Sequence, residues 1–112
     1  MRALNRSSGL DKHADHSGTI TTGGVSQQVL AQDQDRMYLF LQNNGSGDMW
    51  VNFSIAAVIG QPSIRVPAGS ELVEEGNFVS GEAVFAIAAD SAHPFTCKTS
   101  QAIGAGTQAG AP

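Results

Sequence analysis

The 112-residue chain is poor in cysteine, in aromatic side chains and in charge. Its single cysteine, Cys97, allows no intrachain disulfide, so no disulfide framework can hold the fold. The longest apolar run, residues 55–59, is far too short to span a membrane. Residues 1–9 lack the apolar stretch of a signal peptide. We therefore expect a soluble protein that is made in the cytoplasm and contacts no membrane.

Cationic side chains are also scarce, because 6 Lys and Arg face 10 Asp and Glu, for a net charge of −4. No stripe of Lys and Arg is available to contact phosphates, which excludes nucleic acid as a partner. Residues 1–17 are slightly basic, whereas residues 18–99 carry an excess of acids. An acidic body favours a basic protein partner, although ordinary solubility is the simpler explanation of this charge.

The chain does contain a series of short apolar or β-branched runs, separated by Gly, Asn, Asp and Pro. Their alternation with a period of two is typical of half-buried strands. About eight antiparallel strands at a spacing of about ten residues predict an all-β fold, a small jelly roll or β-sandwich with a thin two-layer core. The predicted strands cover residues 18–22, 27–31, 37–43, 48–53, 63–66, 71–74, 84–88 and 95–99.

The strongest local signal is a pair of apolar runs, Met37–Leu41 and Met49–Phe53, on either side of a polar segment. That segment, Asn43–Asp48, is rich in Asn and Gly, which tolerate positive φ. We therefore predict that residues 43–48 form the loop of a β-hairpin.

Aromatic side chains in these two strands are the first candidates for an interface. Tyr38 and Phe40 fall on one face of the strand over residues 37–43, and aliphatic side chains fall on the other. Both faces are thus apolar, so this strand is predicted to be central and either covered on each side or in contact with a partner. Trp50 alternates away from Met49 and could anchor an interface beside Tyr38; a buried core tryptophan is an equal alternative.

Two terminal segments flank the predicted domain of residues 18–99. Residues 1–17 have few apolar anchors, and residues 100–112 are rich in Ala and Gly. Burial cannot offset the entropy of ordering such segments, so both are expected to be flexible arms in isolation. Arg2 and Arg6 in the first arm are further interface candidates.

The segment Asp11–His16 places two histidines and two aspartates within six residues. Imidazole and carboxylate groups are competent zinc ligands, but a structural site needs three or four of them held in fixed directions. Because no regular structure is predicted there, we expect a solvated arm, no metal site and no cofactor.

The predicted domain shows no recognisable catalytic set. His93 is its only histidine, and no Gly-x-Ser-x-Gly motif accompanies it, so a hydrolase that uses His93 is only a minor alternative. Cys97 is expected to be a small buried hydrophobe. Paired carboxylates can serve glycoside hydrolysis or calcium binding, but here a solvated acidic surface is the expectation. These late acids are Glu71, Glu74, Glu75, Glu82 and Asp90.

The order of these signals resembles that of the capsid decoration (cement or staple) proteins of tailed bacteriophages. The resemblance covers most of residues 18–99 and neither arm. It rests on Gly18–Gly24, Arg36–Asn44 leading into Met49–Phe53, Ser63–Ser70, Val84–Ala88 and Pro94–Cys97.

This resemblance implies a non-enzymatic viral structural protein on the outer capsid surface of the virion. Such a protein would form dimers or trimers and clamp neighbouring subunits of the major capsid protein, and its flexible arms would become ordered on assembly. The alternative is a carbohydrate-binding or receptor-binding module of a phage tail or fibre. Trp50, Asn52 and Asn43 could then supply an aromatic platform and polar contacts to a sugar.

Overall fold

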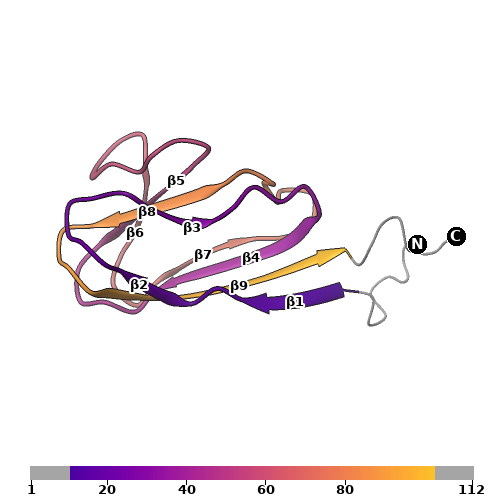
Figure 1. The fold of residues 1–112 in the computed structure, drawn as a ribbon, viewed down its shortest axis with the longest axis horizontal. Helices are drawn as coiled ribbons and strands as arrows, with labels where there is room; N and C mark the ends of the chain where they lie inside the picture. The colour runs from indigo at the N-terminus through magenta and orange to yellow at the C-terminus, as the bar shows by residue number, and fades with distance from the viewer. Residues whose placement is uncertain (1–10, 103–112) are drawn as a thin grey trace, which may run out of the picture.

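The computed structural model describes residues 11–102, and these residues form nine strands in two antiparallel sheets (Figure 1). Both predicted arms extend beyond this range, so Arg2 and Arg6 lie outside the described residues. No helix in the described range is long and apolar enough to cross a membrane. The strands are β1 (Asp11–Asp15), β2 (Gly18–Ile20), β3 (Gln27–Leu30), β4 (Arg36–Asn43), β5 (Met49–Phe53), β6 (Ile64–Val66), β7 (Glu71–Glu74), β8 (Val84–Ala88) and β9 (His93–Ala102).

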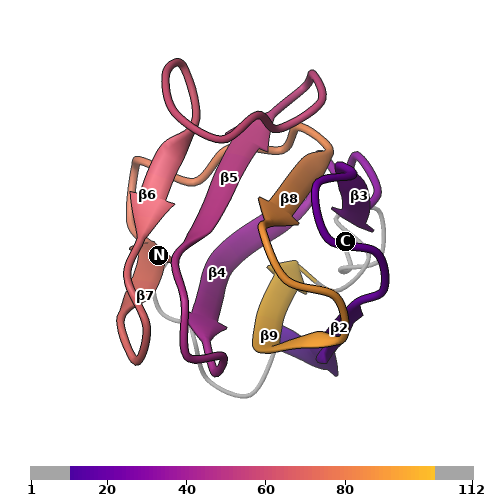
Figure 2. The ribbon, with the colours of Figure 1, turned by 90° about the vertical axis from the view of Figure 1, so that its left-hand side faces the viewer.

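The two sheets pack face to face as a β-sandwich (Figure 2). Sheet A has the order β1-β9-β4-β7, with β2 also paired to β9, and sheet B has the order β3-β8-β5-β6. Strands β2 to β9 thus form two four-stranded sheets, β2-β9-β4-β7 and β3-β8-β5-β6, which is the arrangement of a jelly roll. The all-β fold and its eight predicted strands are confirmed.

The core lies between the sheets because every second side chain of each strand points inward. In β4, Leu39 and Leu41 are fully buried, whereas Tyr38 and Phe40, which alternate with them, are half-buried on the outer face. β4 is central in sheet A, as predicted from its two apolar faces. The core consists of Ile20, Leu30, Leu39, Leu41, Met49, Val51, Val66, Val84, Ala86, Ala88, Phe95 and Cys97.

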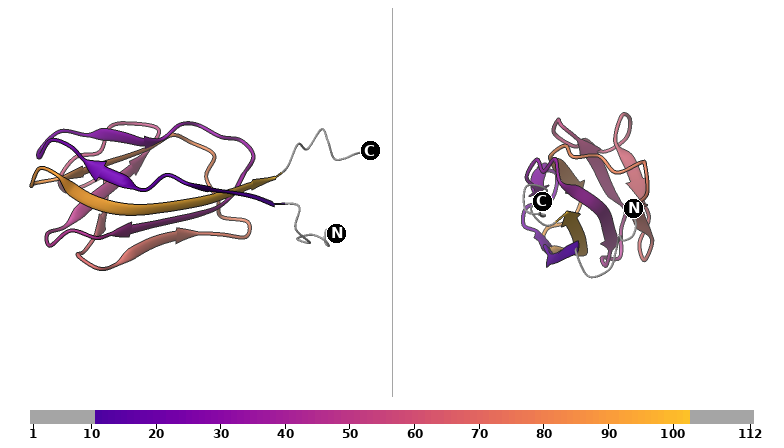
Figure 3. Two further views of the ribbon diagram at one scale, coloured as in Figure 1. Left: turned by 60° about the horizontal axis from the view of Figure 1, so that its bottom comes forward. Right: turned by 90° about the vertical axis from the view of Figure 1, so that its right-hand side faces the viewer.

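Strand β1 lies within the segment that was expected to be a flexible arm. Residues 11–15 pair with the last five residues of β9, and the two strands run side by side (Figure 3). This edge pairing relies on main-chain hydrogen bonds and needs no apolar face, which is why the side-chain pattern did not indicate it. The ordered body therefore begins before residue 18 and continues past residue 99, to Ala102.

The predicted hairpin between β4 and β5 is wrong. β4 pairs with β7 and β9 in sheet A, whereas β5 pairs with β6 and β8 in sheet B. The segment after Asn43 therefore carries the chain from one sheet to the other. An Asn- and Gly-rich segment between apolar runs is compatible with both connections, because local pattern does not identify a strand's partner.

Candidate functional site

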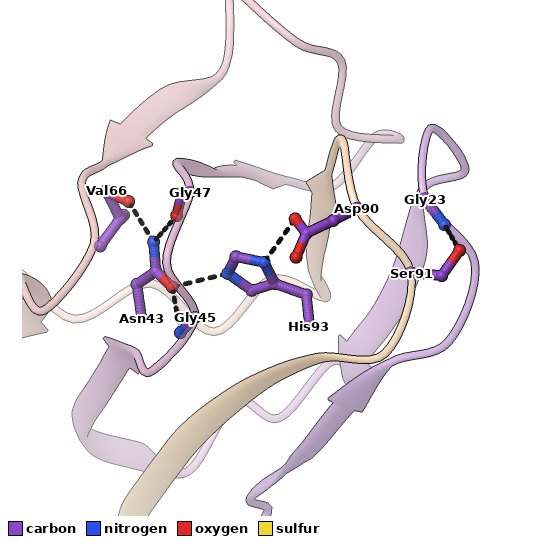
Figure 4. A network of polar contacts seen from close by, with 8 residues as sticks. All are labelled: Gly23, Asn43, Gly45, Gly47, Val66, Asp90, Ser91 and His93. Carbon is purple, nitrogen blue, oxygen red and sulfur yellow. Dashed lines mark hydrogen bonds and ion pairs between the residues drawn. The ribbon is translucent and has the colours of Figure 1, made fainter.

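The polar centre of the molecule is His93, the first residue of β9, whose side chain is fully buried (Figure 4). Its Nδ1 lies 2.8 Å from Oδ1 of Asp90, and its Nε2 lies 2.6 Å from Oδ1 of Asn43. The nitrogens of a buried imidazole need hydrogen-bond partners such as these, because an unpaired buried polar group would lower the stability of the fold. The only histidine of the predicted domain therefore lies in the interior.

Asn43 completes this network from the end of β4, where it is fully buried. Its Nδ2 donates to the carbonyl oxygens of Gly47 (2.7 Å) and Val66 (2.8 Å), and its Oδ1 accepts from the Gly45 amide (2.9 Å). One side chain thus joins the β4–β5 connection to the end of β6. With the His93 contact, all the polar atoms of this amide have partners.

Gly45 is required here for space. A Cβ built on Gly45 would lie 2.3–2.6 Å from three atoms of the His93 ring, closer than real Cβ contacts allow. Positive φ, the reason given for glycine from the sequence, is found at Gly24 and Gly69 but not at Gly45. The glycine therefore lets the imidazole pack directly against the main chain.

The arrangement of Asp90 and His93 is like the carboxylate–imidazole pair of a catalytic triad, but its chemistry differs. In a triad, Nε2 faces a nucleophilic hydroxyl; here it faces the amide oxygen of Asn43. The hydrogen bond with His93 lowers the pKa of the Asp90 carboxyl below its ordinary value. Ser91, the serine closest to His93 in sequence, accepts a hydrogen bond from the Gly23 amide. The geometry is that of a structural network and does not support the hydrolase alternative.

The sugar-binding set suggested by the sequence is not assembled. Asn43 is buried and fully hydrogen-bonded, so it cannot contact a ligand. Asn52 uses its Oδ1 to accept from the Phe53 amide, and Trp50 is half-buried on the outer face of sheet B. Asn43 is therefore not on the surface that Trp50 and Asn52 share, and the three-residue sugar site suggested by the sequence is wrong.

The aromatic interface candidates lie on opposite sides of the sandwich. Tyr38 and Phe40 are half-buried on the outer face of sheet A, where Phe40 is opposite Val73 and Lys98 on the neighbouring strands. Trp50 projects from the outer face of sheet B between Arg65 and Ile87. Trp50 and Tyr38 therefore do not form one shared patch, and each face has its own aromatic side chain.

Arg36 has a role that its sequence position did not reveal. It is only 7% exposed, and its guanidinium donates to the carbonyl oxygens of Ser80 (2.8 Å), Glu82 (2.9 Å) and Ala31 (2.9 Å). It therefore ties the β3–β4 and β7–β8 connections together. Nothing in the sequence around Arg36 distinguished it from Arg65 and Lys98, the other cationic residues of the predicted domain.

The remaining candidate ligands do not converge. Within residues 11–102, no group of three or more His, Cys, Asp or Glu could hold a metal ion. His13 and His16 are exposed along the edge of sheet A. Glu74 accepts from the Ser80 amide and Glu82 from the Ser54 hydroxyl, so these two acids support loops.

Cys97 lies in the middle of β9 with a fully buried side chain, as predicted. Burial raises the pKa of its thiol to about 11. Because the thiolate is the reactive form, this cysteine is a poor nucleophile and a poor partner for disulfide exchange.

Comparisons with known proteins gave one match. No protein-family model matches the chain, and no curated protein matches it either. A solved structure from Bacillus endospore appendages, described as a novel family of disulfide-linked pili, is similar in fold with a TM-score of 0.55. The alignment covers 83% of this chain and 87% of the other at 19% identity. At this identity the match establishes a shared fold.

This match overturns the resemblance to bacteriophage capsid decoration proteins. The motifs that suggested it are the strands and turns of a jelly roll, and such patterns report the fold and not the biological setting. The viral structural function and the location on a virion are therefore wrong, and the comparison does not support the major capsid protein as a partner.

Proposed function

We propose that this chain is a non-enzymatic structural subunit that assembles with copies of itself into a fibre. The observation that carries the proposal is the match, over most of both chains, to a pilus subunit of endospore appendages. The buried network around His93 supports it, since its polar groups are occupied by one another. The surface of a spore is the location that this likeness favours.

An open-ended fibre requires two different contact surfaces on each subunit, so that every copy binds one neighbour with each. The outer faces of the two sheets meet this requirement. One bears Tyr38 and Phe40, and the other bears Trp50. Half-buried aromatic side chains of this kind are common anchors of protein interfaces.

The proposal is tested by electron microscopy and light scattering of the purified full chain over a range of concentrations. Fibres above a critical concentration are the expected result. A protein that stays monomeric, or that forms only closed dimers or trimers, would contradict assembly into a fibre.

Unlike the pili of the matched structure, fibres of this chain are expected to be non-covalent. A chain of disulfide-linked subunits needs at least two bridging thiols in each copy, and these 112 residues contain one, which is buried. We expect fibres to persist in a strong reductant and in the Cys97→Ala variant. Electron micrographs taken with and without reductant check this, and fibres that dissolve on reduction would refute it.

Trp50→Ala is expected to raise the critical concentration for assembly by at least tenfold, because interface tryptophans commonly contribute about 2 kcal/mol or more. Light scattering measures this concentration, and the melting temperature of the monomer monitors the fold. Asn52→Ala is the matched control, since Asn52 lies two residues along the same face of β5. An equal effect on assembly and melting would assign Trp50 to folding alone.

A further inference from the structure

The His93 network lies where the connections at one end of the sandwich meet, an end that we call the loop pole. The Asn43 amide donates to the Ser70 carbonyl, the Asn44 amide to the Pro94 carbonyl and the Gly69 amide to the Asn43 carbonyl. The β4–β5, β6–β7 and β8–β9 connections are thereby brought together around one imidazole (Figure 4). The protonation state of this ring can be worked out from its neighbours.

Asn43 requires a proton on Nε2. Its amide orientation is determined because Nδ2 donates to two carbonyl oxygens while Oδ1 accepts from the Gly45 amide. A flipped amide would place its oxygen against both carbonyls and its NH₂ group against the Gly45 N–H. Oδ1 is therefore an acceptor, and the Nε2 atom at 2.6 Å must be the donor.

Asp90 requires a proton on the other nitrogen. Its carboxylate, with a side chain that is 52% exposed, can only accept when it is ionised. The hydrogen bond with His93 lowers the pKa of this carboxyl, so the carboxylate is ionised at neutral pH. The Nδ1 atom at 2.8 Å must then donate as well.

We propose that His93 is a buried imidazolium whose two N–H groups hold the loop pole closed, so that this end of the sandwich loosens when the ring loses a proton. A neutral ring has one acceptor nitrogen, which would face either a carboxylate or an amide oxygen. Asn43 cannot rotate to correct this without losing three hydrogen bonds. Both hydrogen bonds of the ring therefore require the doubly protonated form.

Among the described residues, Asp90 is the one titratable group that forms a hydrogen bond or ion pair with the ring. Asp90 is its one charged partner from the β8–β9 connection. Asp48, on the β4–β5 connection, is paired with Arg65 of β6 at 2.9 Å. The neighbouring β2 strand (Gly18–Ile20) and the β6–β7 turn (Pro67–Ser70) carry no titratable side chain. The charge at this site therefore depends on the protonation of Asp90 and His93 alone among the described residues.

The first test observes the protons without any substitution. A long-range proton–nitrogen correlation spectrum of the isotope-labelled full chain at neutral pH is expected to show both His93 nitrogens protonated. The exposed His13 and His16 provide internal references in the same sample. A spectrum with one protonated nitrogen would overturn the proposal.

The second test is the pH dependence of stability. Removal of a ring proton would leave one nitrogen facing an acceptor, either the Asp90 carboxylate or the Asn43 amide oxygen. Loss of this hydrogen bond weakens the folded state, so stability is expected to fall as the pH rises. We expect the melting temperature of the wild type to fall by about 5 °C between mildly acidic and mildly alkaline pH.

The Asp90→Asn variant is expected to remove most of this dependence. An asparagine amide can donate to an unprotonated Nδ1, so a neutral ring with a proton on Nε2 would be fully satisfied. Asp48→Asn is the matched control, because it removes a carboxylate from the loop pole that forms no hydrogen bond with His93. The melting temperature of this variant should depend on pH as that of the wild type does. The proposal would be refuted if the melting temperatures of Asp90→Asn and the wild type changed equally with pH.

Discussion

Gly45→Ala is expected to destabilise the protein by about 3 kcal/mol, at the upper end of the cost of overpacking a well-packed interior. The added methyl group would lie 2.3–2.6 Å from the His93 ring. The ring cannot move aside, because it is fully buried and hydrogen-bonded to Asp90 on one side and to Asn43 on the other. Urea-induced unfolding measures the loss.

Gly47→Ala is the matched control for this prediction, since Gly47 lies in the same connection. The nearest atom to a Cβ on Gly47, an oxygen of Asp90, is 3.8 Å away, which is an ordinary contact distance. The φ of Gly47 is not in the left-handed region either. We expect little change for this variant, and equal losses for the two would mean that contact with His93 is not the cause.

Arg36→Met is expected to cost about 3–5 kcal/mol, a large fraction of the roughly 5–15 kcal/mol that stabilises a domain of this size. Methionine can fill much of the space but cannot donate to the carbonyl oxygens of Ser80, Glu82 and Ala31. Three main-chain acceptors would lose a charged donor together. The free energy of unfolding, again from urea titration, gives the magnitude.

The same substitution at Arg65 is the control. Arg65 is exposed and forms an ion pair with Asp48 at 2.9 Å, an interaction typically worth less than about 1 kcal/mol at a surface. Arg65→Met should therefore leave stability almost unchanged. If the two variants behaved alike, burial of the Arg36 guanidinium would not be the source of its effect.

The strand pattern of the molecule was predictable because it depends on local alternation. Each of β2 to β9 was expected from its side chains, since half-buried strands must alternate between the core and the outer face. β1 was missed because an edge strand held by its main chain can carry charged residues such as Lys12 and Asp15 without any apolar face.

The polar network was not predictable, for a different reason. Asn43 and His93 are 50 residues apart, and nothing in either neighbourhood distinguishes a buried Asn from an Asn in a turn. The same holds for Arg36, whose acceptors are main-chain carbonyl oxygens 5 to 46 residues away. Main-chain acceptors are present at every residue, so they leave no trace in the sequence.

The pairing of Asp11 with Ala102 has a practical consequence. The two ends of the described chain leave the sandwich next to each other, at the end of β9 opposite His93 (Figure 3). Along a strand of ten residues this separation is roughly 30 Å. A fluorescent reporter or affinity tag attached directly at Asp11 or at Ala102 would therefore occupy the same corner and leave the distant loops around His93 unhindered.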